Sequence, residues 1–194
     1  MRLILASRSP RRRELLRGAG FDFDVRPSTV EETASPGETP EEFARRAARE
    51  KALEVAASAP PESLVLGADT VVVADGEILG KPANAPDAAR MLRLLSGVTH
   101  RVITGVCIVR APDRVEALAH ETTFVTFRCL DEEEIRDYLA SGEPFDKAGA
   151  YGIQGLASKF VTRVEGCYFN VVGLPVALVC DLLEPLLKGS DQLG

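Results

Sequence analysis

The chain has 194 residues, of which 45% are hydrophobic and 27% are charged, and its formal net charge is −6. These values are typical of a globular protein that buries a sizeable hydrophobic core. The acidic balance argues against a nucleic-acid partner, because general nucleic-acid binding needs a broad basic face. We expect no membrane partner either, since no uncharged apolar stretch reaches the ~20 residues that span a bilayer.

Strands and helices alternate in the pattern of apolar residues. The first part of the chain predicts a strand at 3–6, a helix at 10–17, a strand at 21–25, an acidic loop at 29–39, a helix at 40–57 and a strand at 64–73. The second part predicts a helix at 87–95, a hairpin of strands at 101–109 and 115–127, a helix at 131–140, short strands at 161–164 and 169–172, and a helix at 175–187 that Pro185 should kink or end.

This order of elements favours a mixed fold, α/β or α+β, built on an elongated, twisted mixed sheet that is flanked by helices. We expect residues 1–194 to form a single domain, with room for two lobes around a central cleft.

Three consecutive arginines, Arg11, Arg12 and Arg13, stand in the first turn of the helix predicted at 10–17. The helix dipole prefers anions at that end, so cations there break a local rule, which often marks a functional site. A bound polyanion would compensate them, because free N–H groups, the hydroxyl groups of the preceding serines and guanidinium groups together bind phosphate. The alternative is a basic turn that is simply solvated, and this segment alone leaves both open.

Asp69 places a carboxylate inside the apolar strand at 64–73. Such a group is costly unless it is paired, hydrogen-bonded or bound to a metal. Gly67 and Ala68 leave space beside it for a ligand or for another backbone. In one interpretation Asp69 pairs with a nearby arginine or caps a helix. In the other, which we favour, it orients a water or holds a divalent metal at a phosphate.

Other charged residues are consistent with the same chemistry. Lys81 lies in the stiff Gly80-Lys81-Pro82 turn, Lys51 lies on the helix at 40–57, and Glu31 and Glu32 lie in the acidic loop. Each by itself is most simply a solvated surface charge. Together they offer cations for phosphate oxygens and carboxylates for a metal, as phosphoryl chemistry requires.

The segment at 143–155 is rich in glycine and yet carries Asp146, Lys147, Tyr151 and Gln154. Gln154 has both a hydrogen-bond donor and an acceptor, which suits the reading of a base edge. The segment is not a Walker A loop, and the chain has no Rossmann fingerprint after a strand. The alternative is a surface Ω-loop without a ligand.

Taken together and in order, these motifs resemble those of one known family. The motifs are Ser7-x-Ser9-Pro10-Arg11-Arg12, Gly67-Ala68-Asp69-Thr70, Gly80-Lys81-Pro82, Ser96-Gly97, the segment at 146–155 and Asn170-Val171-Val172-Gly173-Leu174-Pro175. In this order they resemble the Maf proteins, nucleoside triphosphate pyrophosphatases that were first associated with septum formation.

The resemblance implies hydrolysis between the α- and β-phosphates, which gives a nucleoside monophosphate and pyrophosphate. It also implies a divalent cation, Mg²⁺ or Mn²⁺, a cytoplasmic location and a homodimer. The segment at 146–155 resembles the branch that acts on dTTP and UTP, rather than the branch that acts on 7-methyl-GTP. We therefore expect a housecleaning enzyme for dTTP, UTP and modified pyrimidine triphosphates.

The resemblance also implies roles for individual residues. The proton acceptor corresponds to Asp69, which would share the metal with Glu32. Substrate discrimination corresponds to Arg11, Thr70 and Gln154. Substrate binding is assigned to Ser7, Arg11, Arg12, Lys51 and Lys81. Arg13 extends the usual pair of arginines, and its role is left open.

Two other functions fit part of the pattern. A purine triphosphate pyrophosphatase acting on ITP or XTP would share the chemistry but need different base contacts. A nucleotide-binding regulator of cell division, without required turnover, would use the arginines equally well but has little need for the carboxylate of Asp69. A nucleic-acid binder would have to overcome the acidic net charge.

Overall fold

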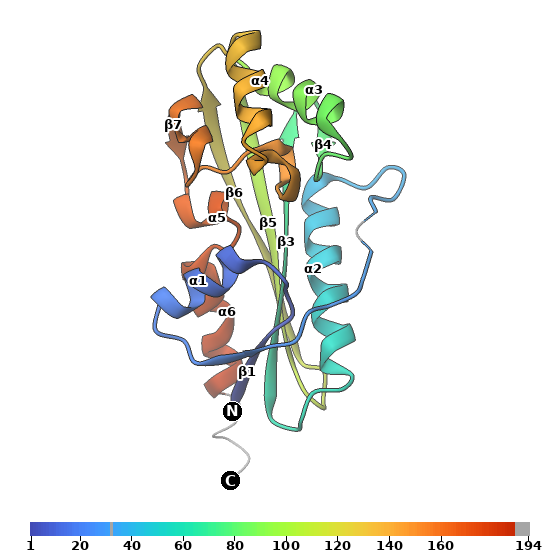
Figure 1. The fold of residues 1–194 in the computed structure, drawn as a ribbon. Helices are drawn as coiled ribbons and strands as arrows, with labels where there is room; N and C mark the ends of the chain where they lie inside the picture. Colours follow the sequence, from blue (N-terminus) through green and yellow to red (C-terminus); the bar gives the residue numbers. More distant parts are fainter. Residues whose placement is uncertain (32, 189–194) are drawn as a thin grey trace. The chain divides into compact units, whose positions relative to one another are not determined.

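The computed structural model describes residues 1–31 and 33–188 (Figure 1). In this part of the chain seven strands form one sheet in the order β2-β1-β3-β5-β6-β7, and β4 pairs with β3. The strands are β1 (Arg2–Leu5), β2 (Phe23–Val25), β3 (Ser63–Ala74), β4 (Glu77–Leu79), β5 (Thr99–Arg110), β6 (Glu116–Phe127) and β7 (Val161–Glu165). The α-helices are α1 (Pro10–Gly18), α2 (Pro40–Ala56), α3 (Ala85–Leu95), α4 (Glu132–Ala140), α5 (Tyr168–Val172) and α6 (Val176–Lys188).

The sheet is mixed. Strand β1 runs parallel to both β2 and β3, whereas the pairs β3–β4 and β6–β7 are antiparallel. Parallel neighbours need a crossover connection, and the helices α1 and α2 supply these connections at the N-terminal end. The expectation of a mixed α/β fold with a helix-flanked mixed sheet is therefore confirmed. None of the described helices is long and apolar enough to cross a membrane.

The chain divides into two compact units. The first unit consists of Met1–Asp69, Thr104–Glu121 and the segment from Gly173 onward, and the second unit consists of Thr70–Ile103 and Thr122–Val172. The division falls inside β3, β5 and β6, so each of these strands contributes to both units.

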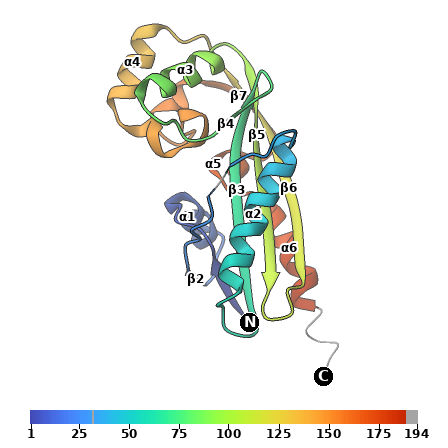
Figure 2. The ribbon, with the colours of Figure 1, turned by 90° about the vertical axis from the view of Figure 1, so that its right-hand side faces the viewer.

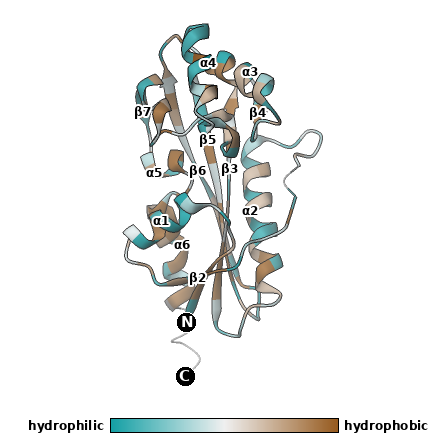
Figure 3. Ribbon diagram, viewed as in Figure 1, coloured by the Kyte–Doolittle hydropathy of each residue, from teal (hydrophilic) through white to brown (hydrophobic). Residues whose placement is uncertain are grey.

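Helices cover both faces of the sheet in the first unit. Leu64 and Leu66 of β3 pack in one hydrophobic cluster with Leu16 of α1 and with residues of α6. Val65, whose side chain points to the opposite face, packs in a second cluster with Ala52 of α2. Figure 2 shows α2 alongside β3, and Figure 3 colours the ribbon by the hydropathy of each residue. Apart from Ser63, Asp69 and Thr70, the residues of β3 are apolar or glycine, as expected of a strand with both faces buried.

Helix α2 lies close to the sheet because small residues face one another. A Cβ atom added at Gly67 would lie 2.8 Å from the backbone nitrogen of Ala52 and would collide with the carbonyl oxygen of Ala48. Gly105 of β5 meets the backbone at Ala44 in the same way. The backbone of α2 therefore fills the space beside Gly67. The sequence had left open whether a ligand or another backbone would occupy it.

The second unit packs around aromatic side chains. The ring of Phe127 makes edge-to-face contacts with His100, Tyr151 and Phe160, and Phe160 makes another with Tyr138. These residues come from β5, β6, α4 and the segment that follows α4. Edge-to-face pairs of this kind add stability beyond the buried area alone.

One local prediction is wrong, and one strand was not predicted. The strand expected at 169–172 is the short helix α5, in which the buried side chain of Asn170 donates a hydrogen bond to the carbonyl oxygen of Val102 at 2.9 Å. Its β-branched sequence favours a strand, but tertiary contacts override that propensity. Strand β4 was not expected; Asp75 and Gly76, both with positive φ, form the turn that connects it to β3. Helix α6 continues past Pro185, so of the two effects expected of this proline, a kink or an end, the end does not occur.

Candidate active site

The carboxylate in the apolar strand is paired inside the first unit. The Nζ atom of Lys51 lies 2.7 Å from Oδ1 of Asp69, and the two side chains are only 8% and 5% exposed. A buried charge is tolerated only with a partner of this kind, because the desolvation of an isolated carboxylate costs several kcal/mol. Lys51, a lysine of α2, is thus a partner that the sequence did not suggest for this carboxylate.

Local sequence explains why Lys51 is available there. Helix α2 begins with a capping box, in which the hydroxyl of Thr39 accepts a hydrogen bond from the backbone N–H of Glu42 and the carboxylate of Glu42 accepts one from Thr39. Lys51 shares the buried face of the helix with Ala48 and Ala52. The close approach of α2 to the sheet then brings the ammonium to β3.

Arg12 is the buried member of the arginine run. Its Nε atom donates to the carbonyl oxygen of Gly173 at 2.8 Å, and its Nη1 atom donates to the carbonyl oxygen of Ala68 at 2.8 Å and to Oγ of Ser7 at 3.2 Å. The guanidinium group therefore ties the start of α1 to β3, one residue before Asp69, and to the segment before α6. Its neighbours Arg11 and Arg13 are only half-buried.

The start of α1 forms as the sequence predicts. Ser9 is the N-cap and accepts a hydrogen bond from the backbone N–H of Arg12, and Pro10 is the first helical residue. Ser7, which is also buried, accepts a hydrogen bond from the backbone N–H of Ser9 at 3.2 Å. The first turn carries no acidic residue. The structure thus brings Ser7, Arg12, Lys51 and Asp69 together near residues 68 and 69 of β3, where the first unit ends.

The remaining predicted residues lie in the second unit or outside the described residues. Thr70 is half-buried on β3, whereas Lys81 and Gln154 are exposed. Two motifs of this unit are joined, because the backbone N–H of Gly149 donates to the carbonyl oxygen of Gly80 at 3.0 Å. Glu32, which we expected to share a metal with Asp69, lies outside the described residues.

The donors around Asp69 bear on the expected metal. Over residues 1–31 and 33–188, no three His, Cys, Asp or Glu side chains gather in a group that could hold a metal ion. Asp69 supplies a hard carboxylate oxygen, which suits Mg²⁺ or Mn²⁺. Mg²⁺ is commonly bound by one or two carboxylates together with substrate phosphates and water, so a single protein carboxylate fits such an ion.

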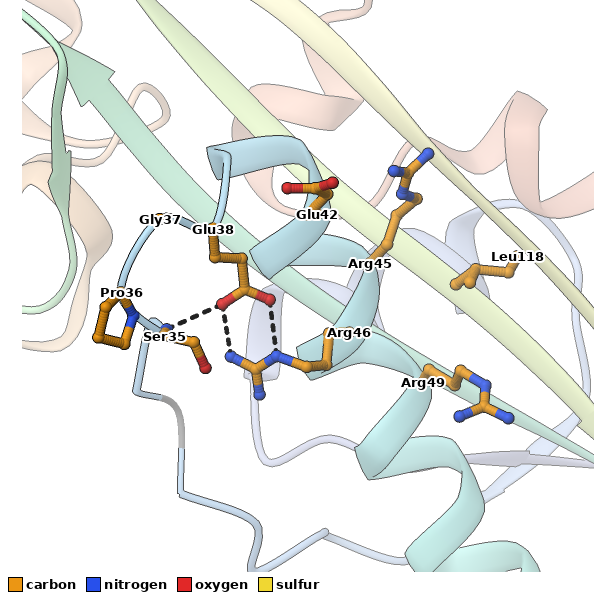
Figure 4. Close-up of a pocket in the computed structure, with 9 residues that line it drawn as sticks. All are labelled: Ser35, Pro36, Gly37, Glu38, Glu42, Arg45, Arg46, Arg49 and Leu118. Atoms are coloured by element: carbon orange, nitrogen blue, oxygen red, sulfur yellow. Dashed lines mark hydrogen bonds and ion pairs between the residues drawn. The ribbon is translucent and has the colours of Figure 1, made fainter.

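A pocket of about 570 Å³ lies elsewhere in the first unit (Figure 4). Ser35, Pro36, Gly37, Glu38, Glu42, Arg45, Arg46, Arg49 and Leu118 line it. Glu38 and Arg46 form an ion pair at 2.7 Å, and this hydrogen-bonded pairing lowers the pKa of Glu38 to about 2. Arg49 is engaged by Glu116 at 2.8 Å. None of the predicted site residues lines this pocket.

Sequence reasoning assigned no role to Glu143, yet its carboxylate organises the segment at 143–156. It accepts hydrogen bonds from the hydroxyl of Tyr138 and from the backbone N–H of Leu156, both at 2.9 Å. The signal in the sequence is the pair of glycines that flank Ile153 and Gln154.

The chain belongs to the family described as Maf-like protein, whose model matches residues 2–186. It is 57% identical to a dTTP/UTP pyrophosphatase of Koribacter versatilis, over 95% of this chain and 94% of that protein. It is 51% identical to a dTTP/UTP pyrophosphatase of Moorella thermoacetica, over 100% of this chain and 98% of that protein. Among solved structures, it resembles a dITP/XTP pyrophosphatase of Mycobacterium abscessus with a TM-score of 0.40 and 18% identity, over 66% and 74% of the two chains.

Proposed function

We propose that the protein hydrolyses dTTP and UTP, together with modified pyrimidine triphosphates, to the nucleoside monophosphate and pyrophosphate. The observation that carries this proposal is the buried Lys51–Asp69 pair, a costly arrangement in an otherwise apolar strand. The two relatives named above, which match nearly the whole chain, bear the name dTTP/UTP pyrophosphatase and supply the substrates.

In the proposed reaction, water attacks a phosphorus atom of the triphosphate and the bond between the α- and β-phosphates breaks. Asp69 orients this water and accepts its proton, which is the work of a general base. Lys51 balances the negative charge of Asp69 and fixes the orientation of its carboxylate. We therefore do not propose Lys51 as a simple phosphate ligand, because its ammonium already lies 2.7 Å from Oδ1 of Asp69.

The cations divide into two kinds. Arg12 donates to backbone carbonyl groups and so shapes the segment beside Asp69. Arg11, together with Ser7, is proposed to bind the triphosphate at the start of α1, where helix N–H groups also favour an anion. Lys81, in the second unit, is proposed from the family resemblance as a further phosphate ligand.

A divalent cation is part of the proposal. Asp69 would hold it, with phosphate oxygens of the substrate, and Glu32 is the second candidate from the family resemblance. When bound, the cation neutralises phosphate charge and so assists the departure of pyrophosphate.

Base selection is proposed for three residues. Arg11, Thr70 and Gln154 correspond to the discriminating positions of the family. Support comes from Gln154, whose side chain is exposed. Its amide can therefore offer a donor and an acceptor to a base edge. From the same resemblance we also propose a homodimer and a cytoplasmic location.

The deciding experiment is a panel of triphosphates scored for pyrophosphate release. dTTP, UTP, dCTP, ITP and 7-methyl-GTP are each incubated with the purified protein, with and without Mg²⁺ or Mn²⁺. Release from dTTP and UTP that depends on the cation is the expected result. Preference for ITP points to the purine enzyme, and tight binding of triphosphate without release of pyrophosphate points to the regulator.

A further inference from the structure

The segment from Glu143 to Leu156, here called the 143–156 loop, lies entirely in the second unit and carries Gln154. The side chains of Tyr151 and Ile153 point into the core, since they are only 5% and 8% exposed. The hydroxyl of Tyr151 lies 2.8 Å from Nε2 of the buried His100. Gln154, the next residue after Ile153, is exposed. The loop therefore has a fixed inner side and presents the amide of Gln154 on its outer side.

One carboxylate closes this loop. Oε2 of Glu143 accepts a hydrogen bond from the backbone N–H of Leu156 at 2.9 Å, so the first residue of the loop holds the last. Oε1 of Glu143 accepts the hydroxyl hydrogen of Tyr138 at 2.9 Å. The same Tyr138 oxygen accepts a hydrogen bond from the backbone N–H of Gly152 at 3.3 Å. The backbone on both sides of Gln154 is thus connected to Glu143, directly at Leu156 and through Tyr138 at Gly152.

Two glycines of the loop, Gly152 and Gly155, leave room for the side chains that close it. A Cβ atom added at Gly155 would collide with the carboxylate of Glu143. A Cβ atom added at Gly152 would lie 2.7 Å from Cε of Lys147, whose ammonium donates to the carbonyl oxygen of Glu143 at 2.6 Å. The Gly-Ile-Gln-Gly sequence is therefore packed directly against the side chains that close the loop.

We propose that Glu143 is a positioning residue for base selection, which fixes the backbone on either side of Gln154 and so presents its amide to a pyrimidine base in one orientation. The proposal rests on the proposed function and deepens it. Glu143 does not itself touch the substrate. Hydrogen bonds from backbone N–H groups to a carboxylate are stronger than those to a neutral acceptor, so the ionised side chain suits this task. Discrimination by hydrogen bonds depends on placement, and small displacements of a recognition group are costly.

The test compares Glu143→Ala with Glu143→Gln and with the control Glu133→Ala, which removes an exposed glutamate of α4. For each folded variant, kcat and KM are measured with dTTP and dCTP. We expect Glu143→Ala to lower the preference for dTTP over dCTP by roughly tenfold, mainly through a higher KM for dTTP. Glu143→Gln should recover part of the preference, because its amide oxygen still accepts from Leu156. Glu133→Ala should match the wild-type protein.

Gly155→Ala supplies an independent arm. In the wild-type background its new Cβ displaces the carboxylate of Glu143, so the preference for dTTP should fall. In the Glu143→Ala background the space is vacated, so the same substitution should add little further loss. If Glu143→Ala does not fold, as judged by thermal unfolding, Glu143→Gln and Gly155→Ala decide the matter.

The outcomes distinguish a failure of the proposed function from a failure of the role of Glu143. A wild-type protein that releases no pyrophosphate from dTTP or UTP overturns the proposed function, and the role of Glu143 with it. A wild-type protein that prefers dTTP, combined with folded Glu143 and Gly155 variants that keep this preference, overturns the role of Glu143 alone.

Discussion

The ammonium of Lys51 and the carboxylate of Asp69 form a buried ion pair between the middle of α2 and the middle of β3. The pair depends on Gly67, because a larger residue there would hold α2 away from the strand. Packing and chemistry are therefore coupled at this point: the glycine that lets the helix approach also lets a lysine reach the acid.

Breaking this pair on one side should be expensive. In Lys51→Met the carboxylate of Asp69 stays buried without its cation, so we expect the free energy of unfolding to fall by about 3–5 kcal/mol. Adding Asp69→Asn in the same chain should restore a large part of the loss, because no uncompensated charge is left. Urea titrations measure both variants, with Lys81→Met as the exposed control. A single variant as stable as that control would contradict the pairing.

Removing the acid should separate binding from turnover. Asp69→Asn is nearly isosteric but cannot accept a proton, so kcat for dTTP should fall by about 10²–10⁴-fold while nucleotide binding largely survives. The matched control is Asp75→Asn, which changes an exposed aspartate in the turn after β3. Pyrophosphate release and equilibrium binding are measured on the same preparations. Turnover by Asp69→Asn at the control rate would remove Asp69 from its assigned role.

Arg12 should not tolerate replacement by lysine. A single ammonium cannot reproduce donation from Nε and Nη1 to the carbonyl oxygens of Gly173 and Ala68, so Arg12→Lys leaves buried acceptors unsatisfied. We expect a loss of about 1–3 kcal/mol in unfolding free energy. Arg13→Lys, on the half-buried neighbour, should change it little. Equal stability of the two variants would show that the Arg12 contacts contribute nothing.

Gly67 should be more sensitive than a glycine in open space. Gly67→Ala forces a methyl group against the backbone of α2, and we expect it to cost about 1–3 kcal/mol or more in unfolding free energy. Gly18→Ala, at the end of α1 where a Cβ atom meets nothing within 4 Å, should be neutral or slightly stabilising. Thermal and urea unfolding of both variants check this. The idea fails if Gly67→Ala is as stable as Gly18→Ala.

His100 should make the protein less stable in mild acid. Burial lowers the pKa of His100 from its ordinary value of 6.5 to about 4. The unfolded chain therefore takes up a proton below pH 6.5, whereas the folded chain does so only near pH 4. Stability falls as the pH drops through this window and does not change above it on account of this group.

The same linkage between protonation and folding gives the size of the stability loss and a control for it. Across the window the loss due to His100 should reach about 3 kcal/mol at most. Unfolding free energies at pH 7.5 and pH 4, compared between wild type and His100→Gln, isolate it, because glutamine can still face Tyr151 but does not titrate. Parallel pH profiles for the two proteins would contradict a neutral buried imidazole.

Most of the fold could be predicted from the chain, and the exceptions have physical reasons. The helix at 10–17 carries its own start signals in Ser9 and Pro10, and β3 is recognisable by its long, nearly continuous run of apolar residues. Residues 169–172 were predicted as a strand because aromatic and β-branched residues favour one in isolation. They form a helix instead, in which the buried Asn170 is hydrogen-bonded to residues of β5 and β6.

Some residues of the candidate site could likewise be predicted from the sequence, and others could not. Asp69 stood out in the sequence because a carboxylate in an apolar strand needs an explanation wherever it lies. Its partner could not be foreseen, because Lys51 reads like any solvated lysine on a helix until α2 is packed against the sheet. Arg12 and Arg11 are neighbours of the same type, and only the packing shows that Arg12 is the one that turns inward.

The sequence by itself determined the class of fold, the family and the position of the acid, because apolar periodicity, capping residues and an isolated charge are local properties of the chain. Only the tertiary structure decided which cation neutralises Asp69, what fills the space beside Gly67 and that Glu143 closes the loop around Gln154. Those relationships join residues that are distant in the chain, or that the sequence cannot tell apart from neighbours of the same type. They exist only once helices and strands are packed.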